Sequence, residues 1–167
     1  MRGEPFQAFP KSGISPKVER FQRRVARDKV EDEKKAEVRK RDQYCRFPRC
    51  GCRRLHFGLA VAHCRHKGMG GNPAGDRSAP EDMILLCAPR HREHPIALDK
   101  GTLRVVPLHE RRGFAGPCTF EVELPARLDA GGAPRWFEVG REIQPHQFEP
   151  FTDEQRDVLA LLATMEL

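Results

Sequence analysis

The chain has 167 residues, of which 38% are hydrophobic and 32% are charged, and its mean hydropathy is −0.66. This length and composition predict one domain with extensions, built on a modest core beneath a large polar surface. No run approaches the roughly 20 apolar residues of a membrane helix, and the first residues lack the apolar segment of a signal peptide. We therefore expect a cytoplasmic protein with no membrane partner.

The formal net charge is +6, and the positive charge is concentrated in one region. Residues 39–67 contain nine Lys or Arg and one acidic residue, a net charge of +8. A focused positive charge is typical of proteins that bind a polyanion, most simply nucleic acid, although a solvated basic surface gives the same composition.

The N-terminal third predicts a long charged helix. Ser15 is a favourable N-cap, Pro16 suits the first helical position, and no Gly or Pro follows until the end of the segment. We expect a helix over 16–42, with a flexible start before it. Val18, Phe21 and Val25 form only a thin apolar stripe, so the helix leans on a partner surface or is partly solvated.

The centre, 43–100, predicts two short strands and a short helix. The strands are LAVAHC (59–64) and MILLC (83–87), separated by a Gly- and Pro-rich connection. After the second strand, Pro89 can open a helix and Pro95 must end it.

From residue 101 onward the pattern changes to β-structure and then to a helix. The segments TLRVVPL, CTFEVELPA and RWFEVGREI are predicted strands separated by glycine-containing turns. Thr152 and Gln155 have the spacing of a capping box before an amphipathic C-terminal helix. The predicted class is therefore α+β, with segments 1–42, 43–100 and 101–167.

Thiol and imidazole side chains gather in the central segment. The chain has six cysteines and seven histidines, and a disulfide framework is not expected in a reducing compartment. Cys64 and Cys118 are interpreted as small core residues. The remaining cysteines and most histidines fall in three short stretches, which together predict metal binding: CRFPRCGC (45–52), VAHCRHKGMGG (61–71) and EDMILLCAPRHREH (81–94).

These three stretches resemble the HNH nuclease family, which has a ββα-metal finger core. The resemblance covers about residues 45–95 and implies a metal-dependent endonuclease acting on DNA. His63 matches the general base that removes a proton from the attacking water, and His91 matches a metal ligand. Asp82 stands where the family usually has an asparagine, and there it would orient the base or join the metal sphere. The native ion would be Mg, Mn, Ni or Zn.

One position departs from the family pattern. The residue before the catalytic histidine is commonly a metal ligand, but here it is Ala62. His66 and His94 are the nearest candidates to replace that ligand. Without a replacement, the chain would be a nuclease-like scaffold that binds nucleic acid and has lost catalysis.

Many members of the family also carry a structural zinc held by two cysteine pairs. Here Cys45 with Cys50 or Cys52 would form the first pair, and Cys87 belongs to the second. Arg90 stands where the fourth cysteine is expected. Cys45, Cys50, Cys52 and Cys87 would supply four thiolates, although two ligands separated by one residue are tightly spaced on one ion.

The phosphate-binding candidates are basic residues close to this core: Arg53, Arg54, Arg65 and Lys67.

A second reading of the spacing remains open. Cys45, Cys50, His63 and His66 come close to the pattern of a Cys2His2 zinc finger, which would bind DNA without cutting it. This reading needs a helix across 55–66, where the composition favours a strand. A zinc-stabilised nucleic-acid-binding module is therefore the alternative function.

Overall fold

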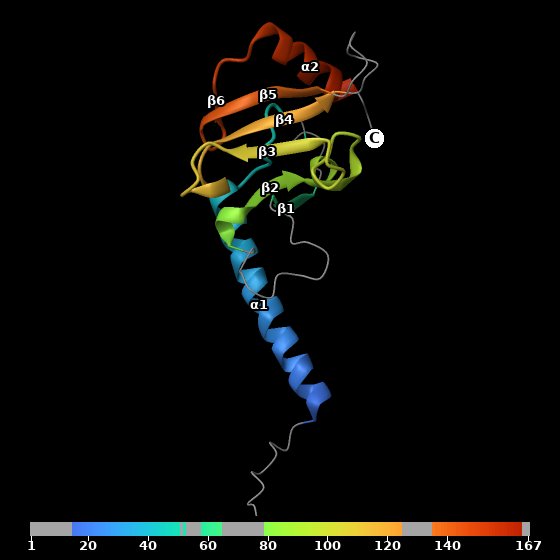
Figure 1. The fold of residues 1–167 in the computed structure, drawn as a ribbon, viewed down its shortest axis with the longest axis vertical. Helices are drawn as coiled ribbons and strands as arrows, with labels where there is room; N and C mark the ends of the chain where they lie inside the picture. Colours follow the sequence, from blue (N-terminus) through green and yellow to red (C-terminus); the bar gives the residue numbers. More distant parts are fainter. Residues whose placement is uncertain (1–14, 51, 53–57, 65–78, 125–134, 165–167) are drawn as a thin grey trace, which may run out of the picture. The chain divides into compact units, whose positions relative to one another are not determined.

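The computed structural model describes residues 15–50, 52, 58–64, 79–124 and 135–164. It combines helices and strands (Figure 1), as the predicted α+β class requires. The chain divides into two units, Met1–Glu33 and Lys34–Leu167. Every buried side chain among the described residues belongs to the second unit.

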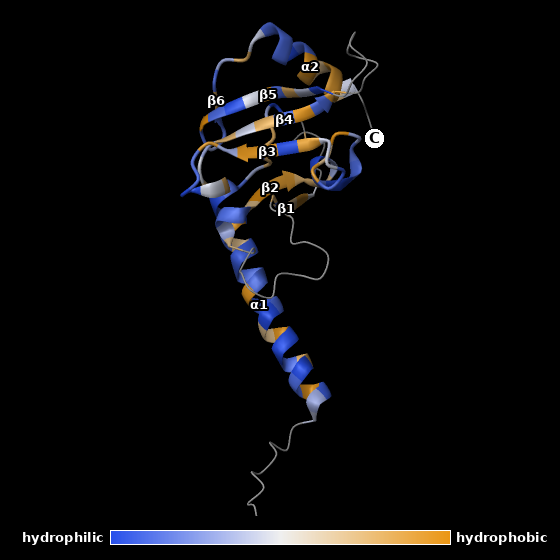
Figure 2. Cartoon of the chain, in the orientation of Figure 1, coloured by the Kyte–Doolittle hydropathy of each residue, from blue (hydrophilic) through white to orange (hydrophobic). Residues whose placement is uncertain are grey.

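Helix α1 spans Pro16–Asp42 and confirms the predicted bounds. Ser15 Oγ accepts a hydrogen bond of 3.4 Å from the backbone N–H of Lys17. Within the first unit the described part of α1 is almost entirely exposed, and Figure 2 shows it as mainly hydrophilic. Ion pairs one turn apart, such as Arg23 with Glu19, line its surface.

Strands β1 (Leu59–His63) and β2 (Met83–Cys87) form an antiparallel hairpin. The helical turn η2 (Pro80–Asp82) precedes β2, and η3 (Pro89–Glu93) follows it. Both predicted strands and the short helix between the prolines are confirmed. The turn η3 is a single wide turn, closed by a 2.9 Å hydrogen bond from the N–H of His94 to the carbonyl of Pro89.

The two faces of this hairpin pack against different neighbours. Val61, Met83 and Leu85 form a small cluster with Val38 of α1. The alternate residues Ala62, Ile84 and Leu86 join the main core instead, because successive side chains of a strand point to opposite faces. Strand β2 is consequently buried along its whole length, and Figure 2 shows it as hydrophobic.

A four-stranded antiparallel sheet follows in the order β3–β4–β5–β6. Strands β3 (Leu103–Pro107), β4 (Cys118–Leu124) and β5 (Arg135–Gln144) correspond to the three predicted strands. The two-residue strand β6 (Gln147–Phe148) was not predicted. The helical turn η4 (Gly113–Ala115) lies in the connection between β3 and β4.

Helix α2 (Asp153–Thr164) packs against β5 and begins with the predicted capping box. The N–H of Thr152 donates to Gln155 Oε1 at 3.0 Å, and the N–H of Gln155 donates to Thr152 Oγ1 at 3.1 Å. Residues of the hairpin, the sheet and α2 share one core, so the segments 43–100 and 101–167 fold together.

A β-bulge in β5 shapes the part of the sheet nearest the cysteines. The pairing with β4 shifts between Phe120 and Glu121, which places Val139 and Gly140 both in buried positions. A Cβ at position 140 would lie 3.1 Å from Pro48 and 3.2 Å from Phe151. Glycine therefore allows the loop after α1 to lie directly on the sheet.

Candidate metal centre

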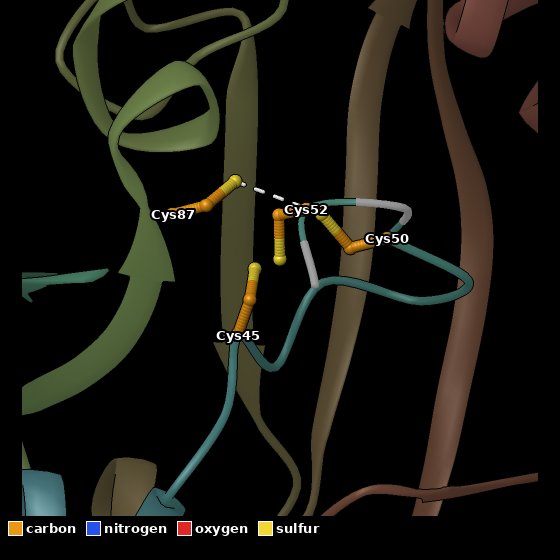
Figure 3. A group of neighbouring side chains, drawn as sticks. All are labelled: Cys45, Cys50, Cys52 and Cys87. Atoms are coloured by element: carbon orange, nitrogen blue, oxygen red, sulfur yellow. Dashed lines mark hydrogen bonds between the residues drawn. The ribbon is translucent and has the colours of Figure 1, made fainter. Parts of the chain in front are cut away.

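Four cysteine side chains converge between the loop after α1 and the end of β2. The candidate ligand atoms of Cys45, Cys50, Cys52 and Cys87 all lie within 4.8 Å of one another, and Figure 3 shows the four side chains gathered in one place. Cys45, Cys50 and Cys52 come from the loop, and Cys87 is the last residue of β2. The sequence prediction that these four residues form one cluster is confirmed.

The sulfur spacing fits a tetrahedral metal site. Zn–S bonds of about 2.3 Å in a tetrahedron place neighbouring sulfurs about 3.8 Å apart. The Sγ atoms of Cys50 and Cys87 are 3.6 Å apart. These residues therefore fit a tetrathiolate ion such as zinc, with only small movements needed to equalise the distances. Cys52 supplies the fourth sulfur of the cluster. Cys50 and Cys52 thus both belong to the cluster, although only one residue separates them in sequence.

The cluster already favours a thiolate at one position. The pKa of Cys50 is lowered to about 2, because Cys45 and then Cys87 donate hydrogen bonds to its sulfur. The pKa of Cys45 is raised, primarily by its hydrogen bond to Cys50. A negative charge shared among close thiols attracts a cation, and a bound divalent ion would displace the remaining protons.

A buried arginine next to the first ligand anchors the cysteine loop. Arg46 is fully buried, and its guanidinium donates to both carboxylate oxygens of Glu142 and to the carbonyl oxygens of Phe114 and Gly116. Its backbone N–H donates to the carbonyl of Leu85 at 3.0 Å. These contacts join the loop to β2, β5 and η4, and thereby fix the position of Cys45.

Asp42 extends this network to the end of α1. Its carboxylate accepts from the backbone N–H of Leu85 at 2.9 Å and from Arg41 Nε at 2.7 Å. Arg41 also donates to the carbonyls of Pro80 and Met83, both at 2.8 Å. Arg41 and Arg46 belong to the basic region 39–67, from which polyanion binding is predicted. Both side chains instead make hydrogen bonds and ion pairs inside the fold.

Sequence analysis did not identify the pair of Arg46 and Glu142. Glu142 follows the β5 bulge, and strict alternation from Val139 would instead turn Arg141 and Ile143 inward. In the structure Glu142 is 1% exposed, whereas Ile143 is 59% exposed. A bulge has no reliable sequence signal here, so nothing in the sequence marked Glu142 as buried.

Two of the predicted catalytic residues, His63 and Asp82, lie at the same end of the hairpin. His63 pairs with Met83 at the end of the hairpin opposite Cys87, and the N–H of Cys64 donates to the carbonyl of Asp82 at 3.0 Å. His63 is partly buried at the end of β1. Asp82 is the last residue of η2, immediately before β2.

Two of the predicted metal-ligand histidines, His91 and His94, lie around η3. His91 is buried, and its Nε2 is 3.4 Å from Asp99 Oδ1. Burial lowers the pKa of His91, which favours the neutral form that a metal ligand requires. His94 follows the turn, and its Nδ1 accepts a 2.9 Å hydrogen bond from the N–H of Ile96. An ion would therefore have to use the other nitrogen of His94.

Among the described residues, the four cysteines are the only group of three or more candidate ligands close enough to share one ion. His63, Asp82, His91 and His94 do not form a second such group in that part of the chain. His66 and the phosphate-binding candidates Arg53, Arg54, Arg65 and Lys67 lie outside the described residues.

The structure also tests the Cys2His2 zinc-finger interpretation and the interpretation of Cys64 and Cys118 as core residues. The segment Leu59–His63 is strand β1, so the helix that a Cys2His2 finger needs across 55–66 is not formed there, and Cys45 and Cys50 group with other cysteines. Cys64 and Cys118 pack in or against the main core, as predicted. Burial raises the pKa of the Cys118 thiol to about 11.

Comparison with known proteins finds no matching family model, no similar curated protein and no similar solved structure. Within the described residues, no helix is long and apolar enough to cross a membrane.

Proposed function

We propose that this chain is a metal-dependent endonuclease that hydrolyses DNA phosphodiester bonds, with a zinc tetrathiolate that stabilises its fold. The observation that supports the proposal is the hairpin register, which pairs His63 of β1 with Met83, the residue after Asp82, on the strand that ends at Cys87. The structural ion would be held by Cys45, Cys50, Cys52 and Cys87.

In this proposal His63 is the general base. The imidazole of His63, at the end of β1, would accept a proton from a water molecule, which then attacks the phosphorus. The carboxylate of Asp82, one residue from the strand partner of His63, orients the imidazole or contributes to the metal sphere. His91 would hold a divalent ion, which supplies positive charge for the oxygen that leaves.

A plasmid assay tests the reaction. The protein is incubated with supercoiled DNA and Mg²⁺, Mn²⁺, Ni²⁺ or Zn²⁺, beside an EDTA sample and a His63→Ala variant. His109→Ala is the matched control, because His109 is an exposed loop histidine away from the hairpin. We expect open-circle or linear product that requires both a metal ion and His63 and that survives His109→Ala.

The second candidate function is a zinc-stabilised module that binds nucleic acid without cutting it. The observation in its favour is Ala62, which is fully buried in the main core and offers no ligand where the HNH pattern commonly has one. Folded protein that retards DNA on a gel but leaves the plasmid intact with every ion would favour this function and exclude the nuclease.

A further inference from the structure

Arg90 is a buried cation without a carboxylate partner among the described residues. It lies in η3, three residues after Cys87, and is 9% exposed. Its Nη1 is 3.0 Å from His94 Nδ1 and 3.5 Å from the carbonyl oxygen of Ile96. Neither partner is a carboxylate, and a buried guanidinium requires a nearby negative charge to offset the cost of its desolvation.

The loop that carries three of the four cysteines holds this guanidinium in place. Arg90 Cζ lies 4.4 Å from the centre of the Phe47 ring, a cation–π contact. Phe47 lies between Cys45 and Cys50 in sequence, and its ring packs edge-to-face on Phe120 of β4 at 6.2 Å. The position of Arg90 is therefore fixed relative to the cysteine loop.

The negative charge that faces Arg90 is that of the cysteine cluster. Burial lowers the pKa of Arg90, and the charges of Cys50, Cys87 and Cys45 act in the opposite direction, together with a hydrogen bond to Cys50. The backbone N–H of Arg90 also stabilises the thiolate of Cys87. Side chain and backbone of one residue thus both contact the cluster.

We propose that Arg90 is the counter-charge of a tetrathiolate metal centre and sets the affinity of that centre for zinc. The inference rests on the metal site proposed above. Four thiolates around a divalent ion carry a net charge of −2, which is costly in a partly buried site. The guanidinium of Arg90, held next to the cysteine loop by Phe47, reduces the net charge of the centre to −1. Arg90 would act outside the coordination sphere, through the ligands rather than as one of them.

Metal titration of the full chain tests this role. Co²⁺ reports coordination through the absorption bands of a tetrahedral thiolate complex, and competition with a chromophoric chelator gives the zinc affinity. The variants are Arg90→Gln, which keeps most of the side-chain stem without the charge, and Arg90→Lys, which keeps the charge. Arg92→Gln is the control, since Arg92 is exposed two residues away and pairs with Asp99.

We expect Arg90→Gln to weaken zinc binding by about 10- to 100-fold, the usual effect of losing a residue that supports metal ligands. Arg90→Lys should recover most of the affinity, and Arg92→Gln should leave it unchanged. The Co²⁺ spectrum of Arg90→Gln should keep its tetrathiolate bands. If Arg90→Gln does not fold, the zinc affinity of Arg90→Lys alone tests the charge role. A near-normal zinc affinity of this variant supports the charge role, and a tenfold loss contradicts it.

Three results would overturn the inference. Equal zinc affinity of Arg90→Gln and the wild type would remove the charge role, and equal losses in Arg90→Gln and Arg90→Lys would indicate shape instead of charge. A wild-type chain that gives no tetrathiolate spectrum would overturn both this inference and the zinc site. Absence of plasmid cleavage, with the Arg90 effect intact, would count against the nuclease alone.

Discussion

At the scale of single residues, the charged groups divide into those that hold the fold together and those that remain at the surface. Arg46, Glu142 and Asp42 are all at most 1% exposed, and each makes hydrogen bonds or ion pairs inside the second unit. A net charge counted from the sequence therefore overestimates the charge at the surface. Among the described basic residues of the segment 39–67, the ones exposed at the surface are Arg39, Lys40 and Arg49.

The buried pair of Arg46 and Glu142 gives the first prediction. Glu142→Gln removes a carboxylate that accepts from Arg46 and from the backbone N–H groups of Cys118 and His146. Breaking a buried ion pair by removing one partner costs about 3–5 kcal/mol, so the free energy of unfolding in urea should fall by that amount.

Glu138→Gln is the matched control, because Glu138 pairs with Arg141 on the same strand at 2.9 Å but at the surface. A surface pair contributes about 0–1 kcal/mol. Equal losses of stability in the two variants would mean that burial of the Arg46 pair has no special effect.

At the scale of elements, two helical turns hold the residues around Asp82. Turns η2 and η4 contact each other, and Gly113 in η4 has a φ of +49°. A Cβ at position 113 would lie 2.5 Å from the carbonyl oxygen of Glu81, in the turn that ends at Asp82. The position of Asp82 therefore depends on a glycine thirty residues away in sequence.

Gly113→Ala is predicted to displace η2 and to destabilise the fold by about 2–4 kcal/mol, from backbone strain and overpacking together. Gly101→Ala is the control: Gly101 has a φ of +72°, but nothing lies within 4 Å of an added Cβ. Only the strain of about 1–2 kcal/mol should then remain. Thermal unfolding of the two variants measures the difference, and equal midpoints would contradict the contact with η2.

Elements with a strong local signal could be predicted from the sequence. Helix α1 has a cap, a proline and a run without breakers, and β2 is an unbroken apolar segment, so both were found with their bounds. The cysteine cluster could be predicted because its thiols are grouped in short stretches of sequence, as in many metal sites. The burial of Glu142 could not, since it depends on a bulge formed by pairing with β4.

At the scale of the whole molecule, the cysteine cluster joins parts of the second unit that are distant in sequence. Cys45, Cys50 and Cys52 belong to the loop after α1, whereas Cys87 ends the second strand of the hairpin. The buried residues of the loop, the hairpin, the sheet and α2 belong to one core. A metal ion at this point would therefore stabilise the unit as a whole, because it binds the folded arrangement and not the unfolded chain.

Metal removal is expected to lower the unfolding midpoint of this unit. A ligand present at a thousand times its dissociation constant contributes about 4 kcal/mol, which corresponds to roughly 10 °C for a domain of this size. Cys87→Ser removes a ligand and should lose the same stabilisation. Cys64→Ala is the control, because Cys64 packs against the core without joining the cluster.

The comparison with chelator separates a metal effect from a packing effect. With zinc present, both variants are expected to be less stable than the wild type. After EDTA treatment the difference between Cys87→Ser and the wild type should nearly vanish, because neither protein holds an ion. The difference for Cys64→Ala should persist, since it arises from a lost core contact. If the stability difference between Cys87→Ser and the wild type persists in EDTA, Cys87 stabilises the fold by packing. The four cysteines would then form a cluster that binds no metal ion.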